Sequence, residues 1–549
     1  MHSREFQPPM PKGSIPSMKL FFRLIYSDKL LFLLTFCISL SYFCYFFLHG
    51  QQNLSYNDAL SRLNIARRVT DSITPGVGQL GAIWLPFPSV LMIPFTLSNF
   101  LWHSGTAGAI ISESAFVLGA VYLKKTAYLI TKNIAASLIV WAIFVSNINV
   151  LLFQTMAMSE SFFLYTLIMS LYFLTKWIVD QKIINFLSAA FFVMLGTLTR
   201  YEGYFMLVGS MVTIGAYLVM RNWRKKNFSK IEGMLLLFLF VASYGIFLWC
   251  LYCLLFFKNP LYWLTLYSGN TGTIVPSASS QRNLLDSMLI YSYTTVWMNG
   301  VFVTLFGILG YLVVCFYVIK SLYKKHNVSN YLPLVIVSTI MFILLIYGYQ
   351  KGYIPPVDLP GFDLQHFLNK KYDFFLPDRT SNIPNIRYGL EMLPFIAIFV
   401  GVLVARVKFI YILVILLIGF QVYTNYQTSL LLQFSIPYAA RYNELPSAHW
   451  LKSNYTNGYI LISDSSNQDF IFETGLPYNR FIYEGTRQYW KRSLSNPSEF
   501  SSWVVYQTKY PGDLVYENMS TKGKRILKKD FKLVYSDKKE YYIYHIVNK

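Results

Sequence analysis

About eleven long apolar segments recur along this chain of 549 residues, and they constrain its fold more than any other feature. A helix needs roughly 20 apolar residues to cross a bilayer. Hydrophobic residues make up 54% of the chain and aromatic residues 18%, too large a share for a soluble enzyme of this length. We therefore expect a polytopic α-helical membrane protein. The expected spans lie near residues 30–49, 105–123, 133–153, 158–178, 184–199, 203–220, 232–256, 300–319, 331–349, 389–405 and 409–431.

The positive charges lie in short groups at the ends of these segments, although the net charge of +21 alone would also suit a nucleic-acid-binding protein. Cytoplasmic loops carry an excess of Lys and Arg. With a cytoplasmic N-terminus, every loop on that side receives such a group, so we expect no nucleic-acid partner, an integral protein of the cell (inner or plasma) membrane and an extracytoplasmic C-terminus. The groups are Lys124, Lys125 and Lys132; Lys176 and Lys182; Arg221, Arg224, Lys225, Lys226 and Lys230; Lys320, Lys324 and Lys325; and Arg406 with Lys408.

A further apolar piece, from Trp84 to Trp102, is interrupted by proline. Counting it as a span would invert all later loops and place Lys124 and Lys125 outside. We therefore expect it to be re-entrant or interfacial.

After Gln433 the chain becomes polar and short alternating runs appear. Such alternation is typical of half-buried strands, and the last two runs, joined by Ser-Asp-Lys-Lys-Glu, predict a terminal hairpin. The predicted organisation is a cytoplasmic segment (1–29), a transmembrane catalytic domain (30–431) and a small extracytoplasmic α/β domain (432–549).

The first external loop concentrates charge in a chain of which only 13% is charged. Asp58, Arg62, Arg67, Arg68 and Asp71 lie within fourteen residues. On a helix, residues three and four apart are neighbours, so Asp58 and Arg62 would share one face.

Three further charged motifs are predicted at the same membrane face. They are Met158-Ser-Glu160, Thr199-Arg-Tyr-Glu-Gly203 and Asn385-Ile-Arg-Tyr-Gly-Leu-Glu391. Tyrosines at this depth are typical of the interfacial aromatic belt. Charged groups at bilayer depth are costly and tend to be functional, so four such motifs on one side favour a site.

These motifs together resemble those of prokaryotic membrane glycosyltransferases of the GT-C superfamily, relatives of protein O-mannosyltransferases and of the aminoarabinose transferases that modify lipid A. The resemblance rests on Asn-Asp-Ala-Leu-Ser-Arg-Leu, Ala-Arg-Arg-Val, Thr-Pro-Gly, Gln-Leu-Gly, Trp-Leu-Pro-Phe-Pro, Ala-Met-Ser-Glu and Leu-Thr-Arg-Tyr-Glu-Gly. It implies a GT-C-like fold, a polyprenyl-phosphate-linked sugar as donor, an extracytoplasmic site and a first-loop Asp, here Asp58, as base. Many relatives carry Lys or His before the Pro-Pro of this loop, where this chain has Trp84 and Leu85.

The chemistry of such a transfer suits the same residues. A planar guanidinium binds a phosphate in two-pronged fashion, and an attacking hydroxyl needs a carboxylate within hydrogen-bond reach. We expect an inverting transfer to a glycan, lipid or protein acceptor, with no cofactor and no metal site because no cluster has metal-ligand spacing. The candidates are Asp58, Glu160 and Glu202 for catalysis; Arg62, Arg67, Arg200 and Arg387 for the donor phosphate; and Tyr201, Tyr388 and Glu391 toward the acceptor.

Two other functions fit the sequence less well. A lipid-linked saccharide transporter or polymerase would also need arginines near a lipid headgroup. It would, however, be expected to carry charged residues along a pathway near the middle of the membrane, whereas here the acidic residues cluster at one face. A non-catalytic membrane scaffold would make Asp58 replaceable without effect.

Overall fold

We describe the fold from a computed structural model of the chain. The predicted cytoplasmic segment (1–29), except for residues 27–29, and residues 433–444, just after the predicted domain boundary, lie outside the residues it describes. It describes residues 27–49, 52–222, 228–264, 283–323, 330–354, 383–407, 410–429, 431–432, 445–508, 513–537 and 541–547.

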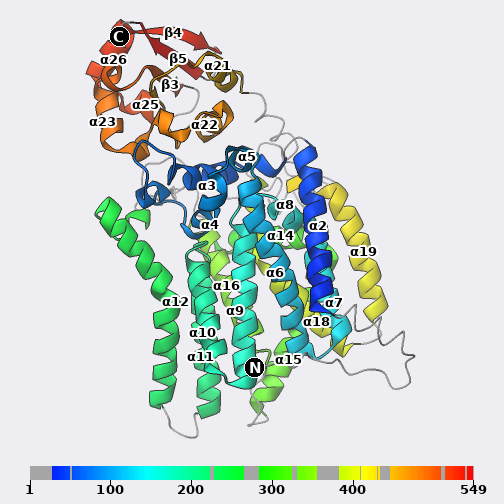
Figure 1. The fold of residues 1–549 in the computed structure, drawn as a ribbon. Coiled ribbons are helices and arrows are strands. Elements are labelled where there is room, and N and C mark those ends of the chain that lie inside the picture. Colours follow the sequence, from blue (N-terminus) through cyan, green and yellow to red (C-terminus); the bar gives the residue numbers. More distant parts are fainter. Residues whose placement is uncertain are drawn as a thin grey trace.

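A bundle of long apolar helices forms the larger part of the molecule (Figure 1). Within the described residues, eight helices are long and apolar enough to cross a membrane, and α7, α10 and α19 are shorter apolar helices. The bundle contains α2 (Asp28–Leu48), α6 (Thr106–Thr131), α7 (Ile134–Val145), α8 (Ile148–Phe153), α9 (Glu160–Asp180), α10 (Ile183–Thr197), α11 (Gly203–Asn222), α12 (Phe228–Phe257), α14 (Leu284–Asn299), α15 (Val301–Tyr323), α16 (Leu332–Gln350), α18 (Leu393–Arg406) and α19 (Tyr411–Thr428).

The polytopic helical architecture predicted from the sequence is confirmed, with one correction. The expected single span at 133–153 is two helices, because Asn147 begins a new helix: its side chain accepts hydrogen bonds from the backbone N–H groups of Asn149 and Val150. Such N-caps satisfy the unpaired N–H groups of a helix start. The break separates α7 from the buried helix α8.

Buried and exposed helices of the bundle differ sharply. α9 and α18 are mostly buried, whereas only 22% of the apolar window of α2 and of α12 is buried. Helices α15 and α18 pack closely at Gly310. A Cβ added there would lie 2.0 Å from the carbonyl oxygen of Phe399 on α18, so only glycine fits. Small residues let membrane helices approach closely, so α9 and α18 form the protein-packed centre and α2 and α12 its periphery.

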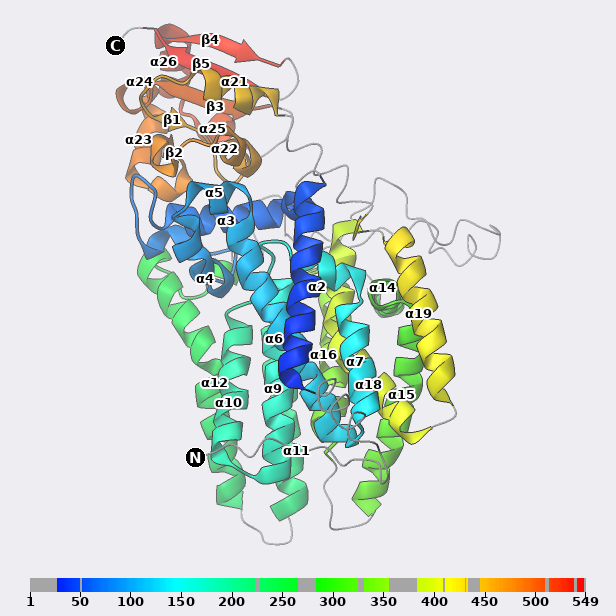
Figure 2. The same cartoon turned by 45° about the vertical axis from the view of Figure 1, so that its right-hand side comes forward.

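A layer of short helices covers one end of the bundle (Figure 2). The predicted helix of the first loop is α3, and the proline-rich piece after it forms two short helices rather than one span. Pro94 lies inside α4. The layer consists of η1 (Gln52–Leu54), α3 (Asn57–Arg68), η2 (Val77–Leu80), α4 (Phe87–Thr96) and α5 (Asn99–His103).

The C-terminal α/β domain lies on the far side of this layer from the bundle (Figure 1). Its five-stranded sheet has the order β2-β1-β3-β5-β4, with β1 parallel to β2 and β3 and the other pairs antiparallel. The predicted terminal hairpin is β4–β5. The elements are α21 (Pro446–Asn454), β1 (Ile460–Leu461), α22 (Gln468–Thr474), η7 (Tyr478–Arg480), β2 (Phe481–Ile482), η8 (Glu484–Thr486), α23 (Gln488–Ser495), α24 (Pro497–Phe500), β3 (Trp503–Gln507), α25 (Leu514–Asn518), α26 (Thr521–Asp530), β4 (Phe531–Ser536) and β5 (Tyr541–Ile546).

Candidate active site

A cavity of about 420 Å³ opens beneath α3. Its walls come from α3, from the segment before α4, from the turn between α10 and α11, and from η5 (Ile383–Met392), which leads into α18. Four sequence-distant motifs therefore meet at one end of the bundle, beside the layer of short helices.

Asp58 forms an ion pair with Arg387 across this cavity. The Nη2 atom of Arg387 lies 2.7 Å from Oδ2 of Asp58, and its Nε lies 3.2 Å from Oε1 of Glu160. The sequence pairs Asp58 with Arg62 by helical spacing, but Arg62 has no hydrogen bond to Asp58 and the close partner of Asp58 is 329 residues away. Both side chains of α3 still face the cavity, as the spacing predicts.

Arg200 is held by three carboxylates. Its two hydrogen bonds to Glu202, at 3.2 Å and 3.0 Å, are two-pronged, and its Nη1 lies 2.8 Å from Glu160. Glu391 is 3.4 Å away, too poorly aligned for a hydrogen bond but close enough for charge attraction. All four side chains are at most 10% exposed, so Arg200 has a fixed position.

Arg62 is buried and only partly paired. Its Nη2 donates to the hydroxyl of Ser159 at 3.2 Å, and its guanidinium lies 4.7 Å from the ring centre of Trp84. Its Nε and Nη1 have no hydrogen-bond partner among the described residues. Burial lowers the pKa of Arg62 to about 10, although the charges of Glu160 and Asp58 oppose this effect. Arg62 is thus cationic at neutral pH, and within the described part of the chain two of its donors lack an acceptor.

Two glycines allow the turn after α10 and the 3-10 helix η5 to pack closely against neighbouring backbone. A Cβ on Gly203 would lie 2.4 Å from the carbonyl oxygen of Gly196, and a Cβ on Gly389 would lie 2.3 Å from that of Thr294. The turn that carries Arg200 and the 3-10 helix that carries Arg387 therefore pack directly on neighbouring helices. This packing sets the positions of both arginines.

Aromatic rings form much of the remaining wall. Tyr201 donates from its hydroxyl to the carbonyl of Ile83 at 3.0 Å and stacks on Trp263, with ring centres 5.1 Å apart and planes 16° apart. Tyr388 lies between two cations, 5.0 Å from Arg200 and 5.8 Å from Arg387. The wall thus offers flat apolar faces beside charged groups.

Most of the site residues expected from the sequence come together here. Asp58, Arg62, Arg200, Tyr201, Glu202, Arg387 and Tyr388 line the cavity, and Glu160 and Glu391 lie behind Arg200.

Arg67 lies apart from the cavity lining. It pairs with Asp71 at 2.8 Å and donates to the carbonyl of Thr96 at 2.6 Å. Five residues along a helix turn a side chain by about 140°, so Arg67 cannot share the face of Arg62.

Sequence reasoning missed two contacts. The Ser159 hydroxyl accepts from both Arg62 and Arg200, each at 3.2 Å. Trp84 covers Arg62, at the point where many members of the resembled family have a cation. The sequence sign of this contact is that Trp84 stands where many members of the resembled family have Lys or His.

Each carboxylate of this cluster pairs with an arginine. Within the described ranges, no group of three or more His, Cys, Asp or Glu side chains could hold a metal ion. Four carboxylates and three guanidiniums leave the cluster near electrical balance, with Arg62 as its least paired cation.

Known proteins offer one informative likeness, and it is structural. No family model and no curated protein matches the sequence. The chain resembles the crystal structure of ArnT from Cupriavidus metallidurans bound to undecaprenyl phosphate, with a TM-score of 0.50 and 10% identity over 94% of this chain and 98% of that one. The Archaeoglobus fulgidus oligosaccharyltransferase in the apo form gives a TM-score of 0.46 and 10% identity over 88% and 70%, too low to add an argument. The chain therefore shares the fold of ArnT, in agreement with the fold that the resemblance in its sequence implied.

Proposed function

We propose that this protein is a membrane glycosyltransferase that transfers a sugar from a polyprenyl-phosphate donor to an acceptor hydroxyl. The observation that carries the proposal is the cavity in which an incompletely paired arginine, Arg62, lies beside the accessible carboxylate Asp58. A protein with the same fold, ArnT, has been crystallised with undecaprenyl phosphate.

The donor phosphate is assigned to Arg62 and Arg387. Two nitrogen atoms of Arg62 lack an acceptor within the described part of the chain, and burying such groups unpaired costs free energy. A phosphate supplies several acceptor oxygens and a charge of opposite sign. Arg62 is held by Ser159 and by Trp84, so it is already oriented when the donor arrives.

Asp58 is assigned as the base. Its side chain is 26% exposed, whereas those of Glu160, Glu202 and Glu391 are 4%, 10% and 4% exposed. Asp58 is therefore the carboxylate that an acceptor hydroxyl can reach, and general-base catalysis needs such contact.

The bond changes follow from these roles. The acceptor oxygen attacks the anomeric carbon while its proton passes to Asp58. The bond from that carbon to the phosphate oxygen breaks, and its electron pair leaves with the polyprenyl phosphate. The arginines stabilise the charge that develops on this leaving group. Attack from the opposite side inverts the anomeric configuration.

The ion pair between Asp58 and Arg387 couples donor binding to the accessibility of the proposed base. The Nη2 atom of Arg387 lies 2.7 Å from Oδ2 of Asp58. A bound phosphate competes for the same guanidinium and so weakens its hold on Asp58. The carboxylate then becomes more accessible to the acceptor hydroxyl as the donor arrives.

Glu160 and Glu202, both catalytic candidates by sequence, are better assigned to positioning. Each is buried against Arg200, and Glu160 also contacts Arg387. Their charges fix the two arginines in the site. Tyr201, Trp263 and Tyr388 give flat faces on which a sugar ring can pack.

Purified protein incubated with polyprenyl-phosphate-linked sugars tests the proposal. A transferase consumes the donor and releases polyprenyl phosphate, with the sugar recovered on an acceptor bearing a hydroxyl. A transporter instead moves intact donor across a liposome membrane. Intact donor in every reaction, together with movement across liposomes, would replace the transferase by the transporter.

A further inference from the structure

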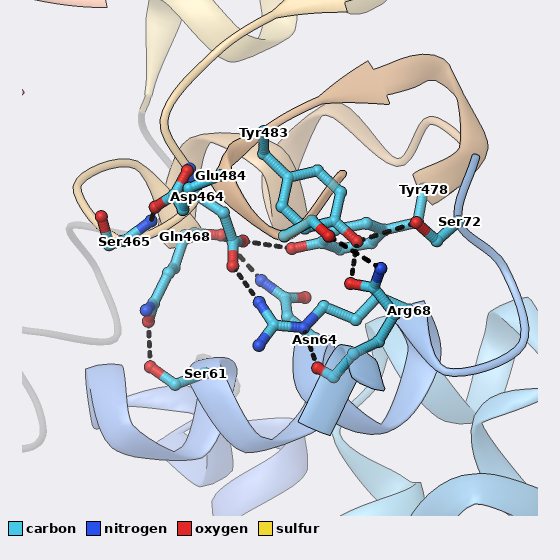
Figure 3. Close-up of polar contacts among 12 residues, drawn as sticks. Ser61, Asn64, Arg68, Ser72, Asp464, Ser465, Gln468, Tyr478, Tyr483 and Glu484 are labelled. Carbon is cyan, nitrogen blue, oxygen red and sulfur yellow. Dashed lines mark hydrogen bonds and ion pairs between the residues drawn. The ribbon is translucent and has the colours of Figure 1, made fainter. Parts of the chain in front are cut away.

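Helix α3 presents different side chains to its two neighbours. Asp58 and Arg62 face the cavity, while Ser61, Asn64 and Arg68 reach the C-terminal domain (Figure 3). The second set is spaced by three and four residues, so it forms one stripe on the helix. The helix that carries the proposed base therefore lies between the cavity and the C-terminal domain.

The N-terminal half of this stripe contacts α22. The hydroxyl of Ser61 donates to the side chain of Gln468, and the amide of Asn64 donates to the backbone carbonyl of the same residue at 3.1 Å. Asn64 is 1% exposed. A single residue of the C-terminal domain thus holds two turns of α3.

Arg68 makes the charged contact at the other end of the stripe. It forms an ion pair with Asp464, and its Nε donates to the carbonyl of Gln79 at 2.7 Å. Burial alone would lower the pKa of Arg68, but Asp464 and Tyr483 outweigh it and raise that pKa. The pair is 12% and 6% exposed, so each charge depends on the other for compensation.

The C-terminal domain holds Asp464 in place from its own side. Tyr478 donates its hydroxyl to Asp464, and the carboxylate of Glu484 accepts from the backbone N–H groups of Asp464 and Ser465 at 2.9 Å and 2.7 Å. Burial and the neighbouring charge of Asp464 raise the pKa of Glu484. The acceptor for Arg68 is therefore preorganised.

A second connection reaches the segment after α3. The hydroxyl of Tyr483 contacts Ser72 at 2.9 Å and donates to Gln79 at 2.8 Å, and Gln79 donates to the carbonyl of Gly485 at 3.1 Å. This segment continues within five residues to Trp84, which covers Arg62. The C-terminal domain therefore holds two walls of the cavity.

We propose that the C-terminal domain positions the active site: Arg68, Asp464 and Tyr483 act as positioning residues that fix the helix bearing Asp58 and Arg62. They touch no substrate and act through α3 and the segment from Ser72 to Trp84. The catalytic part of the inference rests on the proposed transferase function. The mechanical part, the fixing of α3, does not.

Asp464→Asn is the main test, because it keeps the shape of the side chain and removes the charge that Arg68 needs. Deuterium uptake of residues 57–85 should rise in this variant while α9 and α18 stay protected. In protein that is still folded, kcat/KM for the polyprenyl-phosphate donor should fall about tenfold or more, a loss of about 1.4 kcal/mol. Arg68→Ala should cause a similar loss, and Arg68→Lys a smaller one, because lysine keeps a cation opposite Asp464.

Two milder variants and a control accompany it. Tyr483→Phe removes only one hydroxyl and Gln468→Ala only the contacts of one side chain, so they carry the test if Asp464→Asn does not fold. Arg525→Glu changes the charge of an exposed residue on α26 and should alter neither uptake nor kcat/KM.

The outcomes separate the two proposals. Unchanged uptake of residues 57–85 in Asp464→Asn and Tyr483→Phe would overturn the positioning inference, whatever the activity. Raised uptake with unchanged kcat/KM would also overturn it, because a loosened α3 would then not matter. A wild-type protein that consumes no donor would instead refute the proposed function, while the uptake measurement would still decide whether the domain fixes α3.

Discussion

Replacing Arg62 by methionine should make the protein more stable and its donor binding weaker. The guanidinium is 4% exposed, and two of its nitrogen atoms lack a partner within the described residues. A buried polar group without a partner costs about 1–3 kcal/mol. Methionine fills a similar volume without that cost, so Arg62→Met should raise the free energy of unfolding by about 1–3 kcal/mol.

The lowered pKa of Arg62 also predicts a higher free energy of unfolding for Arg62→Met. One pKa unit corresponds to about 1.4 kcal/mol of preference between protonation states, and burial lowers this pKa to about 10. The folded protein therefore disfavours the cation. A phosphate would remove that penalty. Hydrogen bonds to charged groups contribute about 1.5–3 kcal/mol, so the variant should bind donor about 10- to 100-fold more weakly.

Arg67→Met is the matched control on the same helix. Arg67 is fully engaged, with Asp71 and the carbonyl of Thr96 as partners. Its loss leaves these acceptors without their cation, so the unfolding temperature should fall while donor affinity stays unchanged. Apparent Tm at one scan rate and the Kd for polyprenyl phosphate measure both variants. Lower Tm with unchanged affinity in Arg62→Met would refute the reasoning.

Three further predictions follow from the site, the C-terminal domain and the topology. Arg387→Lys should raise the donor KM about tenfold, about 1.4 kcal/mol, because an ammonium cannot bind a phosphate through two parallel hydrogen bonds as a guanidinium does; an unchanged KM in steady-state kinetics would remove Arg387 from the site. Burial and then the charge of Asp469 raise the pKa of Glu473 from 4.5 to about 7, against Lys452. This raised folded-state pKa stabilises the protein at low pH, and the stability is lost as pH rises through 4.5 to 7. Glu473→Gln should therefore raise Tm at pH about 8 and not at pH about 4, and equal effects at both would contradict the assignment. A reporter fused after Lys549 that is active only in the cytoplasm should stay silent, and a signal would mean that the number of spans is wrong.

The helical bundle could be predicted because bilayer length and apolar composition constrain each segment independently. The break at Asn147 escaped that reasoning, because the cap lies inside an apolar run and shows only in the hydrogen bonds that its side chain accepts from Asn149 and Val150. The terminal hairpin was recognisable from alternation and a polar turn. β1 and β2, with two residues each, are too short to show alternation.

Most residues of the candidate site, though not Arg67, could be predicted from the sequence, but their pairings could not. Charged motifs at one face pointed to Asp58, Arg62, Arg200 and Arg387, and the structure places all four at one cavity. Local spacing favoured Asp58 with Arg62, whereas the fold pairs Asp58 with Arg387. Such long-range pairing depends on how helices pack, which single-sequence periodicity does not encode.

The contact between α3 and the C-terminal domain had no sequence signal. Asp464 is one acidic residue in a polar loop, and nothing nearby marks it as the partner of Arg68. Its role is visible only once Tyr478 and Glu484 surround it.

The most direct test of the account is the turnover of Asp58→Asn. Asparagine keeps the size and caps a helix about as well as aspartate, but it cannot take a proton from the attacking hydroxyl. We predict that this variant folds, binds the polyprenyl-phosphate donor and releases sugar about 100-fold more slowly or worse, while Asp71→Asn keeps most of its activity. Wild-type turnover by Asp58→Asn, or the reverse pattern between the two variants, would contradict the assignment of Asp58 as the base.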